Sequence, residues 1–191
     1  MQSLSVTTLP ELSALLTQYG VDVSRYGQGT AKTLSQLLKE LQEGECSLAV
    51  VDGTLTRSVH VLMIAITRED GKRLTETNQT FHATPERAEY SRQRNCLLAE
   101  KLLPEEDIAS AVRRAIREEL GAEMRDDVVI SASTDLEQKP SQSYPGLRCL
   151  YHTVRMTVPA SALDREIPDG YTFTEHFADG QPRVTATWHW L

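Results

Sequence analysis

Two adjacent carboxylates, Glu118 and Glu119, lie near the end of a segment with the spacing of an amphipathic helix. A helix turns roughly 100° per residue. That rotation places four apolar residues on one stripe: Ile108, Val112, Ala115 and Ile116. Glu119 falls roughly 20° from the first of these, inside the stripe, and Glu118 lies at its edge. An ionised carboxylate facing a core is costly unless its charge is compensated, so a bound cation is the natural candidate.

The helix has recognisable ends. Pro104 lies near its expected first turn, and the acidic residues 105 to 107 that follow favour the positive end of the helix dipole. Gly121 provides the residue at which the chain turns away. We therefore expect a helix that begins near Pro104 and ends before Gly121.

Residues 100 to 122 resemble the Nudix box, Gly-x5-Glu-x7-Arg-Glu-hydrophobic-x-Glu-Glu-x-Gly-hydrophobic. Glu106 stands at the first Glu and Arg114 at the Arg, and Lys101 lies where many members of the family carry a Lys. The other matching positions are Ile116, Glu118, Glu119, Gly121 and Ala122. Two positions depart from the pattern, because Glu100 replaces the opening Gly and Ala115 replaces the Glu after the Arg.

The resemblance implies a fold, a cofactor and residue roles. The fold is an α+β domain of the Nudix type, an α/β/α sandwich with a mixed sheet. The catalytic residues would be Glu106, Arg114, Glu118 and Glu119. A divalent cation, Mg²⁺ or Mn²⁺, would be held by Glu118 and Glu119, with Glu100 and a late carboxylate, Glu175, as further ligands. The departure at Ala115 puts hydrolysis in doubt more than it does the fold.

A basic cluster precedes the box in an otherwise acidic chain, and its members are Arg87, Arg92, Arg94 and Lys101. Arg92 and Arg94 are two residues apart, so in an extended segment their side chains project the same way. Guanidinium groups bind phosphate oxygens bidentately. In Nudix-like proteins this region approaches the substrate, so the resemblance makes Arg92, Arg94 and Lys101 candidate substrate-binding residues. A solvated basic loop that balances nearby acids is the alternative.

Composition limits the classes of partner. The net charge of −7 argues against general nucleic-acid binding, because that requires a basic face to replace counterions. The first residues lack the basic and apolar regions of a secretory signal, and no apolar run approaches the length of a membrane span, so we expect neither. Three widely spaced cysteines indicate reduced thiols, and so a cytoplasmic or another reducing intracellular compartment.

Two regions follow from the periodicity. Residues 1 to 45 show two short helices, with leucines at helical spacing from Leu9 to Leu16 and from Leu34 to Leu41. Residues 46 to 191 alternate as strands around the box helix, except for residues 82 to 95, which are polar and expected to be irregular. We expect the leucines of the extension to pack on residues 46 to 191; a homodimer or a protein partner bound through these helices is the alternative.

Two functions remain open from sequence. One is a metal-dependent hydrolase of a nucleoside diphosphate linked to another moiety, in which Glu100 or Glu175 would replace the missing base. The other is a catalytically weak or silent Nudix-like module that binds a nucleotide or a protein in a regulatory role. Metal binding followed by turnover of a substrate panel distinguishes them.

Overall fold

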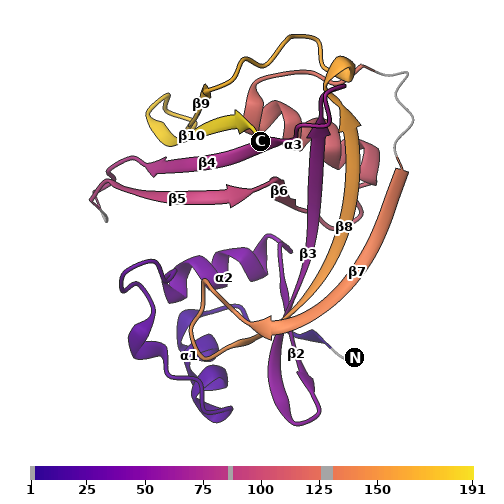
Figure 1. Cartoon of the computed structure of the whole chain (residues 1–191). Coiled ribbons are helices and arrows are strands. Elements are labelled where there is room, and N and C mark those ends of the chain that lie inside the picture. Colours follow the sequence, from indigo (N-terminus) through magenta and orange to yellow (C-terminus); the bar gives the residue numbers. More distant parts are fainter. Residues whose placement is uncertain (1–2, 86–87, 126–130) are drawn as a thin grey trace. The chain divides into compact units, whose positions relative to one another are not determined.

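The computed structural model describes residues 3–85, 88–125 and 131–191. The chain forms two compact units, each made of three segments (Figure 1). The first comprises Met1–Val61, Lys101–Glu105 and Thr134–Val154, and the second comprises Leu62–Glu100, Glu106–Ser133 and Arg155–Leu191. Strands β3 (Thr54–Thr67) and β8 (Arg148–Pro159) each contribute residues to both units. The boundary at residue 45 between an extension and a Nudix-like domain stays a prediction.

One sheet has the strand order β1-β2-β3-β8-β7, and β6 pairs with β3 beside this path. Its remaining strands are β1 (Ser3–Leu4), β2 (Ser47–Val51), β6 (Leu98–Lys101) and β7 (Ser131–Pro140). Strand β2 is antiparallel to both β1 and β3, whereas the neighbouring strands β3 and β8 point the same way in Figure 1. The sheet is therefore mixed, which confirms the α+β class with a mixed sheet.

The first unit contains the two N-terminal helices, α1 (Leu9–Gln18) and α2 (Leu34–Gln42), with a 3₁₀ turn, η1 (Val23–Arg25), between them. Thr8 and Thr33 cap the two helices through reciprocal capping boxes. Leu12, Leu16 and Leu37 are fully buried in one core with residues of β2, β3 and β8. The expected packing within the chain is thus observed, except that Leu9, at the first helical position, is 39% exposed.

The second unit contains an antiparallel sheet with the order β5-β4-β10-β9. Its strands are β4 (Leu74–Phe81), β5 (Tyr90–Cys96), β9 (Tyr171–His176) and β10 (Pro182–Trp190), and a 3₁₀ turn, η2 (Ala160–Ala162), precedes β9. The expectation of an irregular segment from 82 to 95 was wrong where β5 begins. This strand is polar on both faces, which hides its alternation, and pairing with β4 fixes it.

Helix α3 (Ile108–Leu120) is the box helix, and it differs from the prediction at its start. Asp107 is the N-cap and accepts a hydrogen bond from the Ser110 backbone at 3.0 Å, so Pro104 to Glu106 lie in the preceding loop. Ile108 in the first turn is 38% exposed, whereas Val112, Ala115 and Ile116 are fully buried. No helix in the described part of the chain is long and apolar enough to cross a membrane. All three cysteines are free thiols.

Candidate metal and phosphate site

One face of the antiparallel sheet carries the polar residues of the site. Strand register places Glu76, Gln79 and Phe81 of β4 opposite Trp188, Ala186 and Val184 of β10. The same rows continue outward to Cys96, Arg92 and Tyr90 on β5, and to Tyr171, Phe173 and Glu175 on β9. The other face is rich in threonine, where Thr185 contacts Thr174 and His82 at 2.8 Å each.

A β-bulge determines which residues share the site face. Between Glu76 and Asn78 the register of β4 shifts against both neighbouring strands. These two residues pair with consecutive residues of β10, so Thr77 is the extra residue against that strand, whereas their partners on β5 are three residues apart. Without the bulge, strict alternation would place Glu76 on the opposite face from Gln79. The extra residue re-aims Glu76 to the site face. The sequence shows alternation but does not reveal the bulge, which is why Glu76 and Gln79 were not predicted as site residues.

The C-terminal end of α3 packs against this face. The Tyr171 hydroxyl donates a hydrogen bond to the Leu120 carbonyl at 2.8 Å, and the Phe173 ring lies directly against Gly121. Gly121 has φ +59°, the left-handed conformation that ends the helix. This contact brings Glu119, near the end of α3, toward the carboxylates of the sheet.

The Arg114 guanidinium lies among three acidic residues of the box, Glu100, Glu106 and Glu118. Its Nε and Nη2 donate to the two Glu106 oxygens at 2.8 and 2.9 Å, a bidentate pair that fixes the loop against α3. Its Nη1 lies 3.0 Å from Glu118 and 3.8 Å from Glu100. The hydrogen bonds that Arg114 donates to Glu106 and the three negative charges raise the pKa of Arg114. Glu118 is therefore an exposed i,i+4 partner of Arg114 in this structure, with a side chain 51% exposed.

Glu119 is the carboxylate whose charge is least compensated. Among the described residues, no group donates a hydrogen bond or forms an ion pair with its side chain. Burial raises the pKa of Glu119 to about 8, and the charges of Glu175, Glu100 and Glu76 act in the same direction. Arg94 opposes this shift. The sequence prediction that this position needs a counter-charge thus agrees with its surroundings.

Two sheet carboxylates face the same region. Glu76 is 3% exposed; its Oε2 accepts from Arg94 Nε at 3.0 Å, but its Oε1 has no hydrogen-bond partner among the described residues. Glu175 lies 3.6 Å from Arg183. Burial raises the pKa of both carboxyl groups, and the neighbouring arginines oppose the shift.

These residues suit a hard divalent cation by donor type, because Mg²⁺ and Mn²⁺ prefer carboxylate oxygens. The partnerless, buried Oε1 of Glu76 and the uncompensated Glu119 are the observations that favour such an ion. As placed, however, no three acidic, histidine or cysteine side chains of the described residues lie close enough to coordinate one ion.

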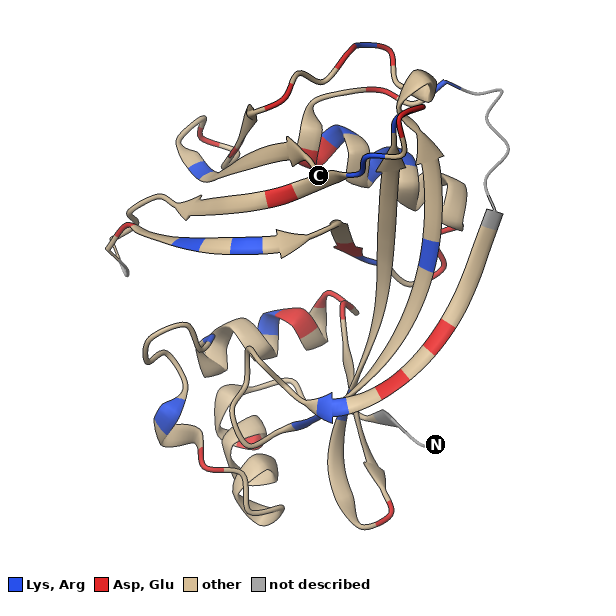
Figure 2. Cartoon of the chain, viewed as in Figure 1, with Lys and Arg blue, Asp and Glu red and all other residues tan. Residues whose placement is uncertain are grey.

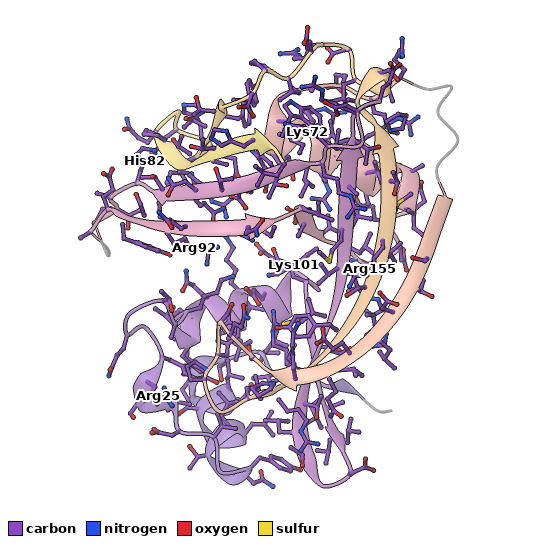
Figure 3. The ribbon with its side chains drawn as sticks, in the orientation of Figure 1. Arg25, Lys72, His82, Arg92, Lys101 and Arg155 are labelled. Carbon is purple, nitrogen blue, oxygen red and sulfur yellow. The ribbon has the colours of Figure 1, made fainter. Side chains whose placement is uncertain are left out.

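The structure brings together two of the three candidate substrate-binding residues. Arg92 and Arg94 on β5 both donate to the Gln79 side chain. They form the two basic segments of β5 in Figure 2, and Figure 3 labels Arg92. Lys101 belongs to the first unit, where it contacts Glu40 at 2.9 Å and also Glu45. Arg87 lies outside the described residues.

Comparison with known proteins gives structural matches only. No protein-family model and no curated protein matches the sequence. Solved structures that match include two MutT proteins and a Nudix hydrolase. One is a structure of MutT from Aliivibrio salmonicida and Vibrio cholerae, 15% identical over 70% of this chain and 79% of that chain, with a TM-score of 0.32.

Two others are similar. A Nudix hydrolase from Nitrosomonas europaea is 21% identical over 68% of this chain and 70% of that chain, with a TM-score of 0.36. A MutT protein from Bacillus halodurans is 12% identical over 69% and 67%, with a TM-score of 0.34. The resemblance of this chain to the Nudix box therefore rests on residues 100 to 122 alone.

Proposed function

We propose that this chain is a Nudix-like, metal-dependent hydrolase of a nucleoside diphosphate linked to another moiety. The observation that carries the proposal is Glu119, a half-buried carboxylate with a pKa raised to about 8 and with Glu175, Glu100 and Glu76 around it. A buried carboxylate that lacks an ion-pair partner and lies near other carboxylates is suited to a divalent cation.

In this proposal, Glu118, Glu119, Glu100 and Glu175 would hold Mg²⁺ or Mn²⁺. When bound, the ion would neutralise the diphosphate and lower the pKa of a water nucleophile. The Glu106–Arg114 pair would hold Glu106 against α3, and Arg92 and Arg94 would bind phosphate oxygens. Lys101 is proposed as a further phosphate-binding residue.

The test is turnover of a panel of nucleoside diphosphate compounds with Mg²⁺ or Mn²⁺, in the wild type and in Glu119→Gln. We expect metal-dependent hydrolysis that falls by roughly 10² to 10⁴-fold in the variant. Thermal melting supplies an independent measurement, because a ligand that binds only the native state raises its stability. Mn²⁺ should raise the melting temperature of the wild type but not that of Glu119→Gln. Absence of both effects would reject the hydrolase.

One observation favours the second candidate, a silent nucleotide-binding module. Ala115, where the resemblance expects a Glu, is fully buried on α3. If loss of that carboxylate silenced the site, Ala115→Glu should raise turnover from background. If another group has replaced it, the substitution should give no gain and should destabilise the helix, because it buries a carboxylate. Folding is therefore measured alongside rate.

A further inference from the structure

Two arginines of β5 share one neutral acceptor. The Gln79 side-chain oxygen accepts from Arg92 Nε at 3.0 Å, from Arg92 Nη2 at 2.6 Å and from Arg94 Nη1 at 3.0 Å. Guanidinium groups only donate, so the amide must turn its oxygen toward both. Gln79 thus holds two positive groups together on the site face of the sheet.

The position of Gln79 makes this arrangement specific. Gln79 is 8% exposed, because it lies on a central strand between Arg92 of β5 and Ala186 of β10. Arg92 is further held against the Phe81 ring, with its guanidinium carbon 5.1 Å from the ring centroid. The geometry is therefore set by the packed sheet and not by two free side chains.

The positive charges of Arg92 and Arg94 are incompletely balanced. Arg94 forms an ion pair with Glu76, but within the described residues Arg92 has no carboxylate partner. Nη1 of Arg92 and Nη2 of Arg94 donate to no protein acceptor in that part of the chain. Like charges at this separation repel, and a neutral amide does not cancel them. An anion with several oxygens would satisfy both the charge and the remaining donors.

We propose that Gln79, Arg92 and Arg94 form a binding site for a phosphoryl group, and that the neutrality of Gln79 is what keeps the site open to an anion. Gln79 is a positioning residue: its oxygen orients both guanidinium groups, whereas a carboxylate in its place would neutralise them. The natural ligand would be the diphosphate of the substrate, and in this respect the inference rests on the proposed hydrolase function. Binding of a phosphoryl group requires neither metal nor turnover.

The test adds one negative charge without changing the size of the side chain. Binding of inorganic pyrophosphate to the full chain is measured by calorimetry in the presence of chelator. We expect Gln79→Glu to weaken pyrophosphate binding by roughly tenfold or more, because the new carboxylate would form ion pairs with both arginines and neutralise them. Its melting temperature should equal or exceed that of the wild type. Arg92→Gln should weaken binding to a similar degree.

Gln93→Glu is the matched control. Gln93 is exposed on β5 between the two arginines, pairs with Asn78 and projects to the threonine-rich face. The Gln93→Glu variant adds the same charge to the strand that carries both arginines. Its pyrophosphate affinity should stay within about twofold of the wild type, because exposed charges are screened. Should Gln79→Glu fail to fold, Gln79→Met removes the acceptor without adding charge, and it should also weaken binding.

Two results would overturn the proposal. One is a wild type that binds no pyrophosphate; the other is a folded Gln79→Glu or Gln79→Met variant that binds pyrophosphate as well as the wild type. Because the probe is measured without metal, a silent hydrolase and an absent phosphoryl site give different outcomes.

Discussion

At the scale of single residues, the protonation of Glu119 links the site to stability. The pKa of Glu119 is about 8 in the folded chain and near the ordinary 4.5 once unfolded. Between these values the folded state binds a proton that the unfolded state has lost. The free energy of unfolding should therefore fall as pH rises from about 4.5 to about 8, by on the order of a few kcal/mol, in metal-free protein.

Urea unfolding at pH 5, 6.5 and 8 in chelator measures this dependence. Glu119→Gln should remove most of the pH dependence of the free energy of unfolding, because the amide does not titrate. The raised pKa values of Glu76 and Glu175 should leave a smaller slope of the same sign. An unchanged slope in Glu119→Gln would show that other groups carry the pH dependence.

At the scale of elements, the end of α3 depends on Gly121. A Cβ at this residue would overlap the Phe173 ring of β9, and φ +59° disfavours any side chain. Gly121→Ala should therefore lower stability by roughly 2 kcal/mol or more and displace Glu119 from the sheet carboxylates.

Gly20→Ala isolates the contribution of the backbone. Gly20 follows α1 with φ +73°, and a Cβ there would have no neighbour within 4 Å. Gly20→Ala should therefore lower the free energy of unfolding by only the strain of a left-handed alanine, roughly 1 kcal/mol. Thermal melting of both variants compares them; equal losses would mean that the contact with Phe173 does not constrain α3.

At the scale of the whole molecule, residues 1 to 45 should behave as part of the fold. Leu16 of α1 is fully buried, whereas Leu9 of the same helix is 39% exposed. Leu16→Ala should lower the free energy of unfolding by roughly 2–5 kcal/mol, while Leu9→Ala should cost far less. Chemical denaturation measures both. A small effect at Leu16 would indicate that the helices are an arm that docks elsewhere.

The sequence by itself determined the features that depend on local spacing. Helical periodicity located α1, α2 and most of the buried stripe of α3, and Gly121 marked the end of α3. These features depend on contacts between residues three or four apart, which a linear pattern records. The box spacing likewise singled out Glu106 and Arg114, which form a bidentate pair in the structure.

Only the tertiary structure decided the features that depend on strand pairing. The bulge at Thr77 places Glu76 beside Gln79, and pairing with β4 makes a strand of residues expected to be irregular. Neither feature has a local signal, because register is set by neighbours distant in sequence. For the same reason, the sequence assigned Arg92 and Arg94 to phosphate but did not reveal the neutral Gln79 that holds them together.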